Sequence, residues 1–273
     1  MRNYAHLAIK GNFIKTDGEE FDENSYKEPP YAIIPVYLPL EDSSHYLSQY
    51  PFSSTRISIP TVYDYVFLDA ELVFDCEVKY IKNEVLYIKP KRFTILNNAQ
   101  ISRMSSKKWS ENLNWGANSK GIGANWIDIH NFGSVRGNLE AFNIVSYIKR
   151  GGVIEAYTKD TKLSNYLFLY DELIEWSVSQ INKQKDVNEF DDVMSLLKKA
   201  NYPKKILLSI GATPTTDIGE NLALEAGDEV FMVIYNRERY KAESIKAYLL
   251  AYRTRNVNYE NMAVLYQTAY LSE

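Results

Sequence analysis

The chain has 273 residues, of which 45% are hydrophobic and 24% charged, the proportions of an ordinary soluble globular protein with one large or two small domains. Its 31 Lys and Arg residues against 35 Asp and Glu residues give a net charge of −4, so no overall basic field favours nucleic acid. The longest apolar run, residues 31–40, contains prolines and is too short to span a bilayer, and the N-terminus lacks the apolar region of a secretory signal. We therefore expect a soluble, cytoplasmic protein without a membrane or nucleic-acid partner.

The first 60 residues predict loops with short extended segments. Residues 6–9 are expected to form a short strand and residues 31–40 an extended segment. The acidic stretch 15–30 between them is typical of a surface loop or lid. The polar stretch 41–54 carries His45, which we interpret as a surface histidine, with a substitute catalytic base as the alternative.

Residues 66–80 alternate between apolar and polar side chains, which predicts a long strand with one buried face. We expect the rest of the chain to be organised around this strand. Its apolar side includes Leu72 and the single cysteine, Cys76. Because Cys76 lies on that side, we interpret it as a small core residue rather than a nucleophile.

The other side of this strand carries Asp69 and Glu71, two carboxylates about 6–7 Å apart along the chain. With a third oxygen donor from a neighbouring strand they could hold a hard divalent cation. The alternative is that they belong to the solvated face of an amphipathic strand. Asp75 and Glu77 continue the same side and are expected to be solvated charges.

The rest of the chain mixes strands, helices and one long segment, residues 104–125, that suits a functional loop. The aromatic and basic stretch 107–115 within it could bind nucleic acid, but the net negative charge argues against this. The expected elements are strands at 85–88, 93–96, 205–210 and 230–235, a hairpin of 142–148 with 153–157, and helices near 169–181, 190–197, 245–252 and 259–266.

Four short blocks follow one another within residues 5–236. They are Asp69-Ala70-Glu71-Leu72, Asn97-Asn98-Ala99-Gln100-Ile101-Ser102-Arg103, Trp115-Gly116-Ala117-Asn118-Ser119-Lys120-Gly121, and Ala212-Thr213-Pro214 with Gly219 and Ala226-Gly227-Asp228. In order and spacing they resemble the fumarylacetoacetate hydrolase (FAH) superfamily, and more closely a bacterial branch of it. Each block is short, so their combination carries the resemblance.

The resemblance implies an α+β, β-rich fold: an FAH-like mixed β-roll with flanking helices, usually found as a homodimer. The FAH-like domain would cover residues 1–236, with residues 1–60 as its N-terminal segment, and residues 237–273 would form a helical C-terminal tail. Members of the superfamily hold Mg²⁺ or Mn²⁺ on three acidic side chains. They cleave, decarboxylate or isomerise keto and diketo acids.

Carried over residue by residue, the resemblance assigns metal-binding roles to Asp69, Glu71 and Asn98. Lys120 would face the substrate as a catalytic cation, and Arg103 and Thr213 would be polar contacts to the substrate. Alternatively, the residues of the loop that contains Thr213 simply form a turn and bind no ligand.

Two positions depart from the superfamily pattern. The third metal ligand is an Asp in the superfamily, whereas this chain has Asn98, whose amide oxygen can coordinate but brings no charge. The pattern also pairs a His with a Glu as general base, and here Glu19 matches the Glu while Thr16 occupies the His position. A threonine is no base near neutral pH.

These observations leave two main functional hypotheses. The first is a divalent-metal-dependent hydrolase, decarboxylase or isomerase of a keto or diketo acid. The second is a catalytically impaired relative that binds a small carboxylate or serves as a structural partner. A weaker third hypothesis is that the tail makes the protein an interaction module.

Overall fold

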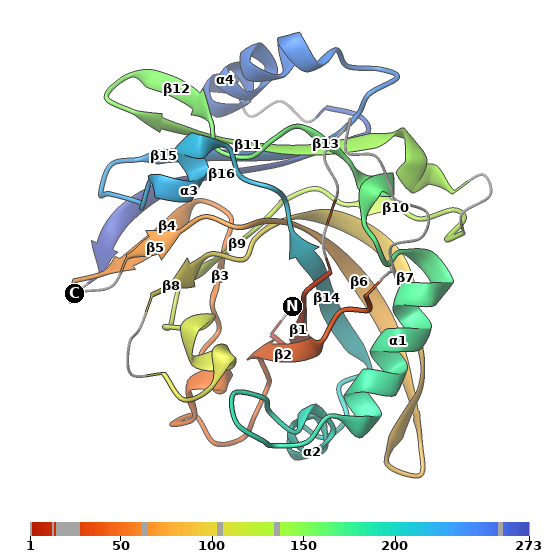
Figure 1. The fold of residues 1–273 in the computed structure, drawn as a ribbon. Coiled ribbons are helices and arrows are strands. Elements are labelled where there is room, and N and C mark those ends of the chain that lie inside the picture. Colours follow the sequence, from red (N-terminus) through yellow and green to blue (C-terminus); the bar gives the residue numbers. More distant parts are fainter. Residues whose placement is uncertain are drawn as a thin grey trace.

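The structure, a computed structural model, describes residues 2–12, 14, 28–61, 65–102, 106–133, 137–255 and 259–272. Two curled sheets dominate it (Figure 1). The eight-stranded sheet has the order β2 (Ala32–Tyr37), β1 (Ala5–Lys10), β14 (Lys205–Ala212), β6 (Ala70–Ile81), β7 (Glu84–Asn97), β9 (Lys120–Ile122) and β3 (Phe52–Ser53), with β10 (Ile127–Asp128) paired to β7. The fold is therefore α+β and rich in strands, as expected.

The second sheet has six strands and packs against the first. Its order is β12 (Val153–Ala156), β11 (Phe142–Arg150), β15 (Glu229–Asn236), β16 (Met262–Ser272) and β4 (Arg56–Pro60), with β13 (Thr161–Lys162) paired to β11. A separate ladder joins β5 (Val66–Phe67) to β8 (Gln100–Ile101). The expected β11–β12 hairpin is confirmed, and Gly151 and Gly152 in its turn have φ of 58° and 88°, a region that side chains disfavour.

Four α-helices lie outside the sheets within the described part of the chain (Figure 1). They are α1 (Tyr170–Lys183), α2 (Val193–Lys199), α3 (Asp217–Asn221) and α4 (Ile245–Arg255), with 3₁₀ turns η1 (Tyr46–Ser48), η2 (Trp109–Asn112), η3 (Asn138–Ala141), η4 (Leu163–Asn165) and η5 (Ala242–Ser244). The expected helices α1 and α2 are confirmed. No helix of the described residues is both long and apolar enough to cross a membrane.

Residues 70–76 of β6 are buried on both faces, which corrects the simple picture of one buried and one solvated side for this part of the strand. Leu72 and Phe74 belong to the main core between the two sheets, where Cys76 is also fully buried as expected. Val73, on the opposite face, belongs to a second apolar cluster with Leu207 of β14. The expected single strand is also interrupted, because residues 68–69 separate β5 from β6.

The acidic residues near the middle of β6 behave differently from one another. Asp75 was expected to be solvated, but it is 5% exposed and forms an ion pair with Arg92 at 2.8 Å. Glu77 is exposed as expected and lies 3.6 Å from Lys91. The cross-strand arginine on β7 explains why a carboxylate can be buried at position 75.

The C-terminal segment differs from the expected run of helix. Helix α4 forms, and its Ile245 and Leu249 pack on the outer face of the six-stranded sheet. The helix expected at 259–266 is wrong, because residues 262–272 form β16, which is antiparallel to β15 and parallel to β4. Apolar residues lie on both faces of this strand, so the spacing of apolar residues in the sequence fits a helix as well as a strand. The pairing with β15 and β4 makes the segment a strand.

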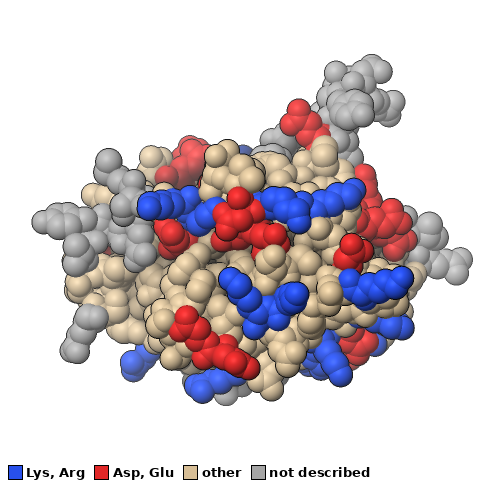
Figure 2. All heavy atoms as spheres, turned by 90° about the horizontal axis from the view of Figure 1, so that it is seen from below, with Lys and Arg blue, Asp and Glu red and all other residues tan. Residues whose placement is uncertain are grey.

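Surface charge is mixed on the face that Figure 2 shows. Lys and Arg residues there alternate with Asp and Glu residues, and neither sign forms a continuous patch. This face therefore offers no strongly basic or acidic surface to a charged macromolecule.

Candidate active site

A row of polar side chains crosses the face of the eight-stranded sheet that carries Val73, opposite the main core. It consists of His6 on β1, Ser209 on β14, Glu71 on β6, Asn98 just after β7, and Lys120 on β9. All five are between 0% and 3% exposed. Buried polar groups on neighbouring strands are costly unless they serve one another or a ligand, so this row marks the candidate site.

An irregularity in β14 helps to shape the row. The register between β14 and β6 shifts between Ser209 and Ala212, as in a β-bulge. Gly211 in this stretch has φ of 122°, and a Cβ atom there would lie 2.2 Å from the carbonyl oxygen of Asn12. A side chain is therefore excluded, and the Gly211 N–H is close enough to Glu71 to lower its pKa.

The two carboxylates of the Asp-x-Glu motif meet at this row. Asn98 donates from Nδ2 to Glu71 Oε1 at 3.0 Å, and the Asn98 backbone N–H donates to the Asp69 carbonyl oxygen at 2.7 Å. Burial raises the pKa of Glu71, against hydrogen bonds from Asn98, Ser209 and Gly211. Burial and the neighbouring Glu71 raise the pKa of Asp69 well above its usual value. The pair therefore holds a shared proton or needs a cation.

A cavity of about 60 Å³ opens beside these carboxylates. Asp69, Glu71, Asn98, Asn112 and Lys10 are among the residues that line it. Three oxygens of these lining residues, Glu71 Oε2, Asn98 Oδ1 and Asn112 Oδ1, are buried without a hydrogen-bond partner in the described structure. All three are acceptors, so the cavity suits a cation or a hydrogen-bond donor.

Two lysines contribute positive charge to the site. Lys120 is fully buried; its Nζ donates to the Ala99 carbonyl oxygen and lies 4.7 Å from the centre of the Trp115 ring. Burial lowers the pKa of Lys120 to about 7, although Glu71 and Asp69 act in the opposite direction. Lys10 is half-buried at the cavity, and its charge lowers the pKa of Asp69.

The structure brings together the three residues expected to bind metal, Asp69, Glu71 and Asn98, and places Lys120 near them rather than in the cavity wall. Thr213 is buried, and its hydroxyl donates to the Ala70 carbonyl oxygen at 2.7 Å, which fixes the start of β6. His45 caps η1, where its Nδ1 accepts from the Leu47 N–H.

The remaining expected residues lie outside the described part of the chain. They are Arg103, Glu19 and Thr16. Among the described residues, no group of three or more His, Cys, Asp and Glu side chains clusters in a way that could hold a metal. Among the described residues the site therefore has two carboxylates, with amide oxygens as the further donors.

Sequence reasoning assigned no site role to four residues that lie here: His6, Ser209, Lys10 and Asn112. His6 Nε2 lies 3.1 Å from Ser209 Oγ, and burial lowers the pKa of His6 to about 3. The alternation of β1 places His6 and Lys10 on one face, but the parallel pairing of β1 with β14 was needed to bring that face to Glu71. For Asn112 no sequence signal exists.

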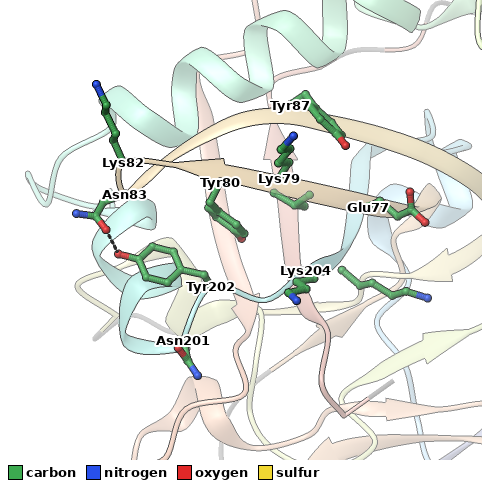
Figure 3. A pocket seen from close by; sticks show the side chains of 11 residues that line it. Glu77, Lys79, Tyr80, Lys82, Asn83, Tyr87, Asn201, Tyr202 and Lys204 are labelled. Carbon is green, nitrogen blue, oxygen red and sulfur yellow. Dashed lines mark hydrogen bonds between the residues drawn. The ribbon is translucent and has the colours of Figure 1, made fainter.

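A larger hollow, of about 740 Å³, lies near the turn between β6 and β7 (Figure 3). Two of its tyrosine hydroxyls are committed to the protein: Tyr202 donates to Asn83 Oδ1 at 2.7 Å, and Tyr80 donates to the Pro203 carbonyl oxygen. Figure 3 shows Lys82 pointing away from Lys204. Because its polar groups do not converge, we place the candidate site at the smaller cavity.

Comparison with solved structures identifies the class of fold. A yeast FAH family protein covers 99% of this chain and 94% of its own, with 12% identity and a TM-score of 0.53. 5-Carboxymethyl-2-hydroxymuconate delta-isomerase from Mycobacterium smegmatis covers 98% of this chain and 79% of its own, with 12% identity and a TM-score of 0.55. A 2-keto-3-deoxyarabinonate dehydratase covers 98% of this chain and 74% of its own, with 11% identity and a TM-score of 0.53. The fold is that of the FAH superfamily, which confirms the resemblance seen in the sequence.

A narrower assignment comes from the sequence family. The model of a family described as "Family of unknown function (DUF5718)" matches residues 17–269, so the chain belongs to this family. No curated protein matches the chain. The family match extends through α4 and most of β16.

Proposed function

We propose that the protein is an FAH-like enzyme that binds a small 2-keto or diketo acid at the cavity beside Asp69 and Glu71. The observation that carries this proposal is the set of three unpartnered acceptor oxygens around one cavity, next to two carboxylates with raised pKa values. The fold and the names of its structural neighbours, a keto-acid dehydratase and a muconate isomerase, support the substrate class.

The residues present fit a divalent cation such as Mg²⁺ or Mn²⁺. Glu71 and Asp69 supply charge, and Asn98 supplies an amide oxygen, all of them hard ligands. When bound, such a cation polarises a carbonyl group and stabilises enolate charge. The low number of carboxylates predicts weak affinity compared with a site of three acids.

The chain's own groups would then bind and orient the substrate. Lys10, at the cavity, would pair with the substrate carboxylate. Lys120, held behind the carboxylates by Ala99 and Trp115, would stabilise negative charge that develops during enolisation. Roles for Arg103, Thr213 and Glu19 in substrate binding and proton transfer stay predictions. A product assay distinguishes C–C cleavage, decarboxylation and isomerisation within this class.

Asn98 favours a second candidate, an impaired relative that binds a small carboxylate without turnover. Its amide brings no charge where the superfamily pattern has an acid. The two candidates share the cavity and differ in whether a keto acid is converted.

Thermal unfolding with Mg²⁺ or Mn²⁺, with and without oxalate, combined with a turnover assay on 2-keto acids, tests both. Ligand at 100 times its dissociation constant adds about 2.7 kcal/mol of stability. Stabilisation by metal and oxalate with turnover supports the enzyme, and stabilisation by oxalate without turnover supports the impaired relative. No stabilisation by any of these ligands contradicts both. We further propose that the protein acts as a cytoplasmic homodimer.

A further inference from the structure

Asn112 is the last residue of the 3₁₀ turn η2, which lies outside the eight-stranded sheet and matches none of the blocks that resemble the FAH superfamily. Its Oδ1 is buried and has no hydrogen-bond partner in the described structure. Asn112 lines the same cavity as Glu71 and Asn98, whose unpartnered oxygens are the other two. A third unpartnered oxygen therefore belongs to a residue that lines the cavity from a different part of the chain.

The turn that carries Asn112 is held firmly. Ser110 donates to Asp191 Oδ2 at 2.9 Å and lies 2.6 Å from the Tyr46 hydroxyl, and the Leu113 N–H donates back to the Ser110 carbonyl oxygen. Leu113 packs with Ala8 and its apolar neighbours. Because η2 is fixed on both sides of Asn112, the unpartnered oxygen is a property of the fold rather than of a loose loop.

We propose that Asn112 Oδ1 is a fourth oxygen ligand of the divalent cation, an inference that rests on the proposed function. Carboxamide oxygens coordinate hard cations, and a cation that prefers six oxygens needs more donors than the two carboxylates and Asn98 provide. Asn112 would add one from outside the sheet. The remaining positions would be left to water or to the oxygens of a keto acid.

Direct titration with Mn²⁺ alone tests this assignment, using the full chain. Asn112→Leu is expected to weaken Mn²⁺ binding at least tenfold. Asn112→Asp, which adds a charged ligand at the same place, is expected to tighten it at least tenfold, and a gain of affinity cannot come from misfolding. The matched control is Asn221→Asp on exposed α3, whose Asn221 side chain bonds locally to the Asp217 carbonyl oxygen. It should change affinity less than twofold.

Water-proton relaxation by bound Mn²⁺ measures the number of water molecules on the ion. This number would not change in the Asn112 variants if Asn112 had only a structural role. Loss of one protein ligand in Asn112→Leu should raise the number of waters on the bound ion by about one. If both Asn112 variants bind Mn²⁺ like the unmodified protein, or if the water number stays constant, Asn112 is not a ligand and the proposed function stands. If the unmodified protein binds no Mn²⁺, the metal-dependent function itself fails.

Discussion

At the scale of single residues, Asn98 decides how strongly the site can hold a cation. Its Nδ2 donates to Glu71 Oε1, while its own Oδ1 is buried without a partner in a residue that lines the cavity. The amide thus supports one carboxylate and offers a neutral ligand at the same time. An aspartate at this position would lack the hydrogen bond to Glu71 and would add a third negative charge.

We predict that Asn98→Asp binds Mg²⁺ and Mn²⁺ at least tenfold more tightly than the unmodified protein. Without metal it should be about 1–3 kcal/mol less stable, because Glu71 loses a buried donor and gains a like charge. Calorimetric titration and urea unfolding measure the two effects. Asn221→Asp is the control, since the exposed Asn221 side chain bonds locally to the Asp217 carbonyl oxygen, away from the site. Equal affinity of Asn98→Asp and unmodified protein would mean that Asn98 does not face the cation.

Lys120 predicts a pH dependence of stability. Its pKa is about 7 in the folded protein and about 10.5 in an unfolded chain. Between these values the unfolded chain binds one more proton, so this group makes the free energy of unfolding rise with pH, by up to about 1.4 kcal/mol per unit. Below pH 7 the lysine is protonated in both states and its contribution is constant.

In Lys120→Met this rise should disappear. Urea unfolding of both proteins at intervals from pH 7 to pH 10 measures it. The unmodified protein should gain stability relative to Lys120→Met across this range. A constant difference between the two proteins would show that Lys120 keeps an ordinary pKa.

At the scale of elements, the sequence predicted β6 well because alternation reports directly on strand faces. Leu68, Ala70 and Leu72 are buried as expected. What alternation could not report is the second apolar cluster on the other face, where Tyr37 and Phe52 from distant segments pack in the same cluster as Val73. The burial of the carboxylates depends on these distant segments.

The C-terminal strand shows the same limit of prediction. Residues 262–266 are apolar or aromatic without a clear period, and only the pairing with β15 and β4 makes them a strand. Asn112 lies in a segment expected to be a loop, and its place at the cavity follows from the anchoring of η2. Periodicity in one segment cannot encode such contacts between segments.

Strand β16 also supports the site, through Gln267. This fully buried side chain accepts from Asn97 Nδ2 at 3.0 Å and donates to the Arg56 carbonyl oxygen at 2.7 Å. We predict that Gln267→Leu lowers the free energy of unfolding by about 1–3 kcal/mol, because Asn97 Nδ2 and the Arg56 carbonyl oxygen lose a buried partner. Urea unfolding measures the change, and a value within 0.5 kcal/mol of zero, roughly the range of surface substitutions, would contradict it.

At the scale of the whole molecule, the exposed apolar surface bears on the predicted homodimer. In the C-terminal segment, Tyr240, Tyr248 and Tyr259 stack on one another edge to face. Ile81, Leu86 and Tyr87, between 43% and 49% exposed, instead leave apolar surface at the β6–β7 turn. We still predict a homodimer, on the superfamily resemblance. Sedimentation at micromolar concentration measures it, and a monomer would reject it.

The most direct test of the whole account is calorimetric titration of the unmodified protein and of Glu71→Gln with Mn²⁺. Glu71 is the buried carboxylate that faces the cavity with an unpartnered oxygen. We predict one weak site per chain in the unmodified protein and at least tenfold weaker binding in Glu71→Gln, since the substitution removes one of two charged ligands. Absence of binding to the unmodified protein, or equal binding to both proteins, would contradict the assignment of a cation site at this cavity.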